Sequence, residues 1–512
     1  MLTLRRCAAA LLPALTLLGG CATPGPEWGP GASLDRTMQG TAELYAERIA
    51  SIDDDDGLNA VIVYDPDPRA KVDAAIETGP LNGRTVLLKD NIESREWPTT
   101  AGSLALAGNA TGRDAPLVAN IRRAGGVILG KTNLSEWANI RSSDSTSGWS
   151  AVGGQTHNPH ATDRNPCGSS SGSGAAVAAG LAWAAIGTET DGSITCPASV
   201  NGVVGFKPTV GMVSRTHVVP ISSSQDTAGP MATSVRNAAL LLGAMAGSDP
   251  ADAATAQADA RRTDFTAGLD DYSLQGVRIG VLRNQVGDND QVTALFEQAL
   301  ADLRRAGAVP MEIDYQPQGE MYEAEFTVLL FELRETLDAY LAGSPADIPV
   351  RSLADVIAFN EANAATELRW FGQDTFVQAS ETTDRAAYEA ARATSLKLAG
   401  AEGIDRLLRE HDVAFLIAPT TGPAWPIDLV YGDAYPGGIG AGSLAAIAGY
   451  PHLSVPMGAV EALPVGLSIM GAKWSDHAVL KAGRAFEKAR SAAVPVPSLQ
   501  RWSATAAPGS SN

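Results

Sequence analysis

The chain is 512 residues long, which suits one large α/β domain or two to four smaller domains and exceeds what a single minimal core needs. It carries 38 lysines and arginines against 57 aspartates and glutamates, a formal net charge of −19. No basic stripe offsets this charge, so nucleic acid is not an expected partner, because phosphate binding requires clustered cations.

The N-terminus is typical of an export signal. Arg5 and Arg6 precede an apolar stretch too short to span a bilayer, and small residues lead to Cys21. The end of this segment resembles a bacterial lipoprotein signal, so we expect residues 1–20 to be removed and Cys21 to be lipidated; an ordinary signal peptide with an incidental cysteine is the alternative. Ala22 favours the outer membrane, which predicts an exported, periplasmic protein whose only membrane contact is this possible lipid anchor.

Beyond this signal the chain divides by composition. Residues 21–36 are rich in proline and glycine, which suits a flexible tether. We expect the folded domain over residues 37–495, with a mostly helical insertion at about 319–411, and a disordered tail over 496–512.

Short apolar runs bounded by turn residues alternate with amphipathic helices along the domain, for example the helix predicted over 290–307. The strand-sized runs lie at 84–91, 125–133, 276–282, 413–420, 452–458 and 465–471. This alternation predicts an α/β fold with a large mixed, mostly parallel central sheet covered by helices on both faces.

Two short motifs match other enzyme classes. Residues 125–132 fit the phosphate-binding-loop pattern, but their centre is apolar and β-branched, which favours a strand over a loop of phosphate-binding amides. Residues 168–172 fit G-x-S-x-G with Ser170 at the centre, but a loop precedes them and no acid-then-histidine context follows. An α/β-hydrolase therefore stays only as a minor alternative.

Three cysteines remain after residue 20, namely Cys21, Cys167 and Cys196. In an exported protein Cys167 and Cys196 could form a disulfide. Both lie among small residues in crowded segments, and we expect two packed free thiols. No Cys/His spacing is typical of zinc, and the acidic run at 53–56 lacks the alternation of a calcium loop, so no metal is expected.

Three segments together carry the main functional signal. Lys89 ends an apolar run in LLKDN, Ser169 lies in CGSSSGSG, and Ser193 lies in GTETDGSITCPAS. With GKTNLSEWA and QDTAGPM, these segments resemble the amidase signature family of serine hydrolases over most of the chain, from about residue 40 to residue 490. The resemblance implies the amidase signature fold and amide hydrolysis without a metal or cofactor.

The resemblance also implies roles for three residues. Ser193 is the expected nucleophile, Ser169 the bridging serine preceded by a cis peptide bond, and Lys89 the base. A lysine accepts a proton only when it is neutral, which requires burial or neighbouring cations. The apolar run before Lys89 can carry it into a desolvated interior, although a lysine reaching from a strand end to water is the alternative.

The resemblance places an oxyanion hole at the backbone amides of Thr190, Asp191, Gly192 and Ser193. Glycine before the nucleophile lets the backbone approach the substrate closely. Many family members have two glycines here, whereas this chain has Asp191-Gly192.

Further residues match family positions and are expected to support the site. Ser170 is expected to orient Ser169, while Ser171 and Ser173 are expected to bond neighbouring backbone. The remaining supporting residues are Asn133, Glu136, Gln225 and Asp226.

Within the family the sequence looks closest to bacterial peptide amidases, which release ammonia from C-terminally amidated peptides. An amidase for aliphatic, aryl or fatty-acid amides is the alternative, because pocket walls and not catalytic motifs set specificity. A glutamyl-tRNA amidotransferase subunit is disfavoured by the signal peptide and the acidity. An inactive binding protein on the same scaffold is a minor alternative, since all three catalytic residues are present. The sequence gives no indication of oligomeric state.

Overall fold

A computed structural model describes residues 38–54, 57–435 and 437–504 of the chain. The predicted signal peptide, the lipidation site Cys21, the tether over 21–36 and the last eight residues of the predicted tail lie outside these ranges. Within them, no helix combines the length and apolar character that crossing a membrane requires.

The strands include every strand-sized run that the sequence predicted. They are β1 (Val61–Tyr64), β2 (Thr85–Lys89), β3 (Val127–Thr132), β4 (Trp149–Ser150), β5 (Gly154–Gln155), β6 (Ala184–Glu189), β7 (Val204–Lys207), β8 (Thr227–Ala232), β9 (Arg278–Leu282), β10 (Val309–Ile313), β11 (Phe415–Pro419), β12 (His452–Val460) and β13 (Leu463–Met470). The segment that fits the phosphate-binding-loop pattern is thus largely the strand β3.

Eleven of these strands form one mixed sheet in the order β1-β3-β2-β6-β8-β7-β12-β13-β11-β9-β10, which confirms the mixed central sheet. Parallel pairing occurs in two groups, β3-β2-β6 and β11-β9-β10. The strands between these groups pair antiparallel. The serine and lysine segments all adjoin the first parallel group.

Alternation along the strands sends side chains to opposite faces of this sheet. Val86 and Leu88 of β2 join a core that also includes helices α3 (Pro116–Arg123), α6 (Val235–Met245), α8 (Asp290–Arg305) and α16 (Asp476–Ala489). Leu87 joins a different core with Ala175 of helix α4 (Ser171–Ala178). Lys89, two residues beyond Leu87, therefore belongs to the face that α4 covers. Helices lie on both faces, as predicted.

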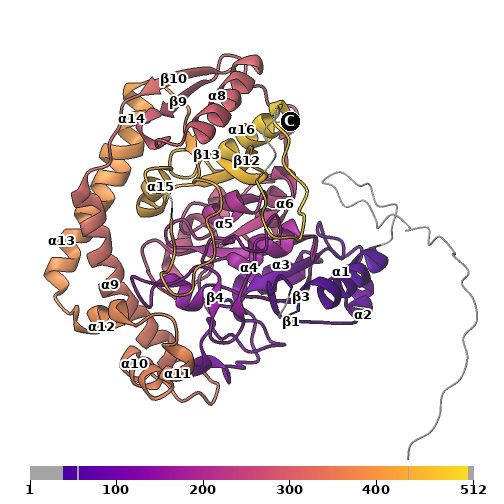
Figure 1. Ribbon diagram of the computed structural model, residues 1–512, viewed down its shortest axis with the longest axis vertical. Helices are drawn as coiled ribbons and strands as arrows, with labels where there is room; N and C mark the ends of the chain where they lie inside the picture. Colours follow the sequence, from indigo (N-terminus) through magenta and orange to yellow (C-terminus); the bar gives the residue numbers. More distant parts are fainter. Residues whose placement is uncertain (1–37, 55–56, 436, 505–512) are drawn as a thin grey trace, which may run out of the picture. The chain divides into compact units, whose positions relative to one another are not determined.

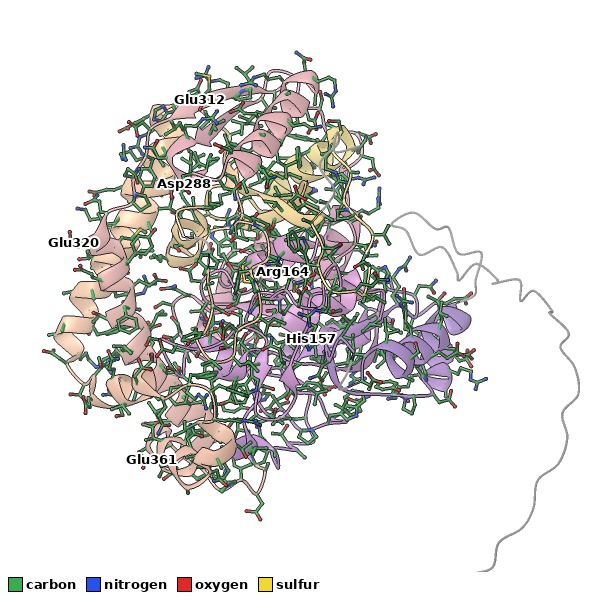
Figure 2. The ribbon with its side chains drawn as sticks, viewed as in Figure 1. His157, Arg164, Asp288, Glu312, Glu320 and Glu361 are labelled. Atoms are coloured by element: carbon green, nitrogen blue, oxygen red, sulfur yellow. A yellow bond between two sulfur atoms is a disulfide. The ribbon has the colours of Figure 1, made fainter. Side chains whose placement is uncertain are left out.

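The remaining helices include the predicted helical insertion, which extends along one side of the sheet domain (Figure 1). They are α1 (Met38–Ile52), α2 (Arg69–Ala75), α5 (Thr195–Val200), α7 (Ala258–Arg261), α9 (Gly319–Ala342), α10 (Leu353–Ala362), α11 (Ala364–Glu367), α12 (Asp374–Glu381), α13 (Arg385–Leu396), a π-helix over Lys397–Ile404, α14 (Asp405–Glu410) and α15 (Gly442–Ala448). Four of the acidic side chains on the surface are Asp288, Glu312, Glu320 and Glu361 (Figure 2).

The chain stays packed beyond residue 495, where the predicted tail begins. Ser498 Oγ donates to the carbonyl of His160, and the Trp502 indole donates to the carbonyl of Glu461. The guanidinium of Arg164 lies over the Trp502 ring, 4.3 Å from its centre. These contacts extend the packed domain past the predicted boundary.

Candidate active site

Lys89 is the last residue of β2 and is fully buried. Its Nζ donates to Ser169 Oγ at 2.7 Å, to Thr188 Oγ1 at 2.9 Å and to the Thr188 carbonyl at 3.2 Å. Burial lowers the pKa of Lys89 to about 7, against the opposing attraction of Asp226 and Glu189. Lys89 is therefore an amine that can be neutral near neutral pH, as a general base must be.

Ser169 lies in the loop that leads into α4, and the peptide bond between Gly168 and Ser169 is cis. The residue is completely buried. Its carbonyl accepts a hydrogen bond from the Ser135 backbone at 3.1 Å, and its hydroxyl accepts the hydrogen bond from Lys89. The structure thus brings the predicted base and the predicted bridging serine into direct contact.

Ser193 follows β6 in the loop that leads into α5. Ser170 N donates to the Ser193 carbonyl at 3.1 Å, so the two serine loops adjoin. Glu189 fixes the second loop, because its carboxylate accepts hydrogen bonds from the amides of Ile194 at 2.7 Å and Thr195 at 2.9 Å. Ser193 is 9% exposed and Ser169 is buried, so Ser193 is the more exposed of the two serines.

The other serines of the first loop bond locally. Ser171 Oγ donates to the Cys167 carbonyl at 2.6 Å, and Ser173 Oγ donates to the Ile186 carbonyl at 3.0 Å. Ser170 Oγ donates to the Thr188 carbonyl at 3.1 Å and accepts from the Thr188 amide. Ser170 therefore holds Thr188, which in turn accepts hydrogen bonds from Lys89. The Ser170 hydroxyl does not bond a histidine among the described contacts, as the serine of a nucleophile elbow would.

The predicted oxyanion loop presents free amides. Among the described residues, the backbone N–H groups of Asp191, Gly192 and Ser193 have no hydrogen-bond acceptor. Gly192 has a φ of +79°, and the space beside its Cα is open, so backbone conformation and not crowding selects glycine there. Burial raises the pKa of Asp191 to about 6, while the hydroxyl of Ser443 opposes the rise.

Gln225 and Asp226 hold Thr190 from two sides. Thr190 Oγ1 donates to Asp226 Oδ1 at 2.6 Å, and Gln225 Nε2 donates to the Thr190 carbonyl at 3.3 Å. The second oxygen of Asp226 accepts from the amides of Ile221 and Ser222. Both predicted supporting residues therefore anchor the start of the predicted oxyanion loop.

Asn133 and Glu136 lie in the surrounding scaffold. Asn133 bonds the loop at 150–156, where its Nδ2 donates to Thr156 Oγ1 at 3.0 Å. Glu136 pairs with Arg141 at 2.8 Å, and both side chains are buried. Burial raises the pKa of Glu136 despite this cation. Neither side chain has a hydrogen bond or ion pair with the lysine and serines among the described contacts.

Several site residues escaped the sequence analysis. Thr188 and Asn91 lie beside Lys89, and Asn91 Nδ2 donates to Thr188 Oγ1 at 3.0 Å. Glu325 of α9 accepts from Gln225 Nε2 at 2.8 Å, and Glu332, seven residues on, accepts from Ser224 N at 3.0 Å. Residues seven apart share a helix face, so α9 holds the loop of Ser224 and Gln225, and Gln225 in turn bonds the Thr190 carbonyl in the predicted oxyanion loop. Two acids at that spacing in an otherwise apolar helix face were the available signal.

Cys167 and Cys196 form a disulfide, so the expectation of two free thiols is wrong. Cys167 lies two residues before Ser169, and Cys196 lies three residues after Ser193. The sequence does not show that these two loops converge, and only their convergence makes pairing possible. The bridge packs against Val200, Ala424 and Trp425 and ties the two serine loops together.

We expect removal of this disulfide to weaken the fold around the serines. The double variant Cys167→Ser/Cys196→Ser should lose about 3.6 kcal/mol of unfolding free energy, the loop-entropy contribution of a bridge that closes a loop of this length. Denaturant unfolding with and without reductant measures the loss, and free-thiol titration should rise by two thiols on reduction. A wild-type protein whose unfolding is indifferent to reductant would contradict a stabilising role; the double variant, which has no bridge to reduce, is the control.

Comparison with known proteins agrees with this geometry. A family model described as Amidase matches residues 41–480. The X-ray structure of native peptide amidase from Stenotrophomonas maltophilia is similar, with a TM-score of 0.86 and 49% identity over 91% of this chain and 96% of that chain. A probable amidase of Arabidopsis thaliana is 37% identical over 472 residues, covering 88% of this chain and 87% of the relative. One subunit of the glutamyl-tRNA(Gln) amidotransferase of Symbiobacterium thermophilum is 34% identical over 469 residues, covering 87% of this chain and 92% of the relative.

Proposed function

This chain belongs to the amidase family and is an amide-hydrolysing enzyme, and from that premise we propose that it acts through a Ser193-Ser169-Lys89 triad on C-terminally amidated peptides, releasing ammonia. The observation that carries the triad is the 2.7 Å hydrogen bond from the buried Lys89 Nζ to Ser169 Oγ, in the loop beside Ser193. Membership of the family supplies the reaction class, and this contact supplies the base.

In this proposal Ser193 Oγ attacks the amide carbon while its proton passes to Ser169 and the proton of Ser169 passes to Lys89. The protons return through Ser169 to the amide nitrogen, the C–N bond breaks, and ammonia leaves. Water then hydrolyses the acyl-enzyme by the same relay. The mechanism requires a hydrogen bond from Ser193 to Ser169 when substrate is bound, and the 3.1 Å bond between the two loops supports that approach.

The oxyanion that forms during attack would be bound by the free amides of Asp191, Gly192 and Ser193. Donors of this kind typically contribute about 3 kcal/mol each to the transition state. Asp191 is the unusual member, because a carboxylate beside a developing negative charge would repel it. Its pKa, raised to about 6, keeps the group partly protonated at mildly acidic pH.

Sequence identity favours a peptide amide over other amides as the substrate. This chain is identical to peptide amidase at about half of the aligned positions and to the amidotransferase subunits at about a third. The alternative substrates are aliphatic, aryl and fatty-acid amides. An inactive binding protein is opposed by the intact Lys89, Ser169 and Ser193.

We also propose that the enzyme works after export, in the periplasm, and that neither nucleic acid nor a cofactor takes part.

Ammonia release from an amidated dipeptide tests the substrate class. We expect the amidated dipeptide to be hydrolysed with a higher kcat/KM than simple aliphatic and aryl amides measured beside it. A preference for small or lipid amides would leave the mechanism standing and overturn the peptide substrate. Failure of every amide tested would favour the inactive scaffold.

A further inference from the structure

A cavity of about 500 Å³ reaches the Lys89 environment from the side of Ser169. Asn91, Ser169 and Thr188 form its inner end. Ser169 Oγ and Thr188 Oγ1 both accept hydrogen bonds from Lys89 Nζ, and Asn91 Nδ2 donates to Thr188 Oγ1. The cavity therefore ends at the residues that surround the proposed base.

The outer end of this cavity lies at the surface beside α9. Thr336, Ala339, Tyr340 and Gly343 line it and recur every three or four residues, so they occupy one face of that helix and its C-terminal end. Ala339 and Gly343 are exposed, as are Ser223 and Ala251, which also line the cavity. The cavity thus connects solvent with the Ser169 side of the site.

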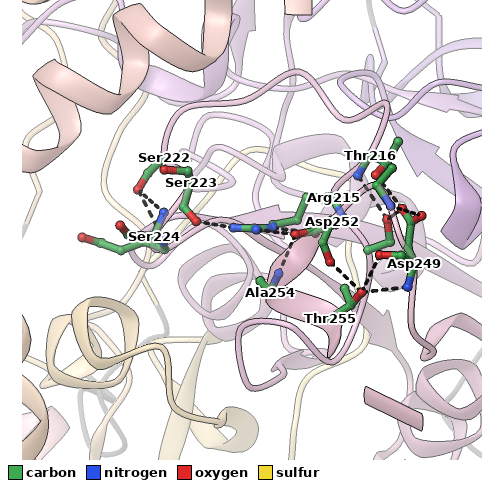
Figure 3. A network of polar contacts seen from close by, with 12 residues as sticks. Arg215, Thr216, Ser222, Ser223, Ser224, Asp249, Asp252, Ala254 and Thr255 are labelled. Atoms are coloured by element: carbon green, nitrogen blue, oxygen red, sulfur yellow. Dashed lines mark hydrogen bonds and ion pairs between the residues drawn. The ribbon is translucent and has the colours of Figure 1, made fainter. Parts of the chain in front are cut away.

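A rigid segment forms one wall. Arg215 lines the cavity, its guanidinium pairs with Asp252 at 2.6 Å, and it also donates to the Ser223 carbonyl. Thr216 Oγ1 donates to the Asp249 carboxylate in the same network (Figure 3). Because both ends of this wall are fixed by charged hydrogen bonds, the cavity is a built feature and not a gap beside a loose loop.

The cavity lies on the leaving-group side of the proposed chemistry. Among the described residues, Asp191, Gly192 and Ser193 do not line it, whereas Ser169 does, and Thr190 is the one residue of the expected oxyanion segment that lines it. In the proposed mechanism Ser169 gives its proton to the departing nitrogen, so that nitrogen must be adjacent to Ser169. A group attached to the nitrogen would point into this cavity.

The cavity suits a neutral apolar group. Most of its walls are apolar, with Ala138, Val218, Val219, Pro220, Ile221 and Ala228. Its charged groups already have partners: Arg113 pairs with Glu93 at 2.6 Å, Arg215 pairs with Asp252, and Asp226 accepts from Thr190 and from backbone amides. No unpaired lysine or arginine remains there, among the described residues, to favour an acidic amine component.

We propose that this cavity binds the amine substituent of N-substituted amides, with a neutral apolar substituent such as a benzyl group as the class that it fits. This rests on the proposed function, because it uses Ser169 as the proton donor to the leaving nitrogen. Ammonia is about the size of water, about 30 Å³, and would fill only a small part of the cavity. With an N-benzylamide, the C–N bond breaks, the nitrogen takes the proton from Ser169, benzylamine leaves, and water cleaves the acyl-enzyme.

The test compares an amidated dipeptide with the N-benzylamide of the same dipeptide, measuring ammonia and benzylamine release. We expect the wild type to cleave both. In Ala339→Phe the added ring occupies the outer end, so kcat/KM for the benzylamide divided by that for the primary amide should fall by about tenfold or more. Ala342→Phe is the matched control, because Ala342 is exposed on the same helix but does not line the cavity, and the ratio should stay within about twofold.

Free aniline, a neutral amine at pH 7, gives a second measurement. It should compete with the benzylamide in the wild type and lose this effect in Ala339→Phe. Primary-amide cleavage without benzylamide cleavage would overturn the cavity assignment and leave the proposed function standing. An alternative outcome is that Ala339→Phe lowers kcat/KM equally for the primary amide and the benzylamide, by an amount that varies with the acyl part of the substrate. That result would identify the cavity as an acyl pocket and overturn its assignment to the amine substituent. Failure of both substrates would overturn the proposed function and this inference together.

Discussion

Replacing Ser193 by alanine is expected to abolish ammonia release from an amidated dipeptide, with kcat falling by about 10⁴- to 10⁶-fold. The substitution removes only the hydroxyl group, whose oxygen would form the acyl-enzyme. Because Ser193 is 9% exposed at the end of a fixed loop, alanine should fit without disturbing the fold. Steady-state ammonia release measures the loss, and circular dichroism checks the fold.

Ser173→Ala is the matched control for this loss. Ser173 lies in the first turn of α4, where its hydroxyl is hydrogen-bonded to the Ile186 carbonyl and to Thr132 Oγ1 and has no hydrogen bond to Lys89 among the described contacts. We expect Ser173→Ala to keep its activity within about tenfold, since the two neutral hydrogen bonds that it removes contribute about 1 kcal/mol each to stability and do not involve Lys89. A serine-directed covalent inhibitor should label Ser193 in both the wild type and this control. Full activity in Ser193→Ala, or labelling at another serine, would contradict the assignment of the nucleophile.

The sequence predicted those parts of the fold that local pattern determines. The apolar run before Lys89 is buried at every position, and the run at 125–133 contains a strand. Lys89 and the two serines were predicted because their motifs resemble those of the amidase signature family, and the structure places them at the end of β2, before α4 and between β6 and α5. β2 and β6 are parallel neighbours, so Lys89 and the loop that holds Ser193 leave the sheet at the same edge, and hydrogen bonds join the Ser169 segment to both.

Long-range pairing was not predictable in the same way. The disulfide between Cys167 and Cys196 depends on the distance between two loops, which no local pattern reports. The bracing of the oxyanion segment by Glu325 and Glu332 joins α9 to a loop about 100 residues earlier in the chain. Acids on a helix are usually solvated, so the spacing of these two places them on one helix face, and the tertiary structure is needed to identify the loop that they contact.

Lys89 should give the activity a specific pH dependence. Because the pKa of Lys89 is lowered to about 7, kcat/KM for a neutral amide should rise with pH through an inflection near 7 and then level off. Lys89→Met should lower kcat by about 10³-fold or more and remove this inflection, leaving a residual rate that grows as hydroxide replaces the missing base. The measurement is a pH–rate profile of ammonia release for both proteins.

Two neighbouring groups titrate close to this range and supply the controls. The pKa of Asp191 is raised to about 6 by burial, and burial lowers the pKa of Lys207 to about 8. Asp191→Asn and Lys207→Met should therefore keep an inflection near 7, whatever their absolute rates. If either variant lost the inflection while Lys89→Met kept it, the titration near pH 7 would belong to Asp191 or Lys207. That outcome would contradict Lys89 as the base.

The lowered pKa of Lys89 must also affect the unfolding free energy of the protein. Measuring that free energy tests the burial of Lys89 independently of its role in catalysis. The pKa of Lys89 is about 7 in the folded protein and 10.5 in the unfolded chain, so the unfolded state binds more protons between these values. The unfolding free energy should therefore rise with pH from about 7 to about 10.5, and below pH 7 the destabilisation is fully present. Lys89→Met has no proton to bind in either state and should lack this slope, so the variant should be the more stable protein near pH 7 and lose that advantage toward pH 10. Parallel stability curves for the two proteins would mean that Lys89 is charged in the native state, and an ammonium cannot accept the proton of Ser169.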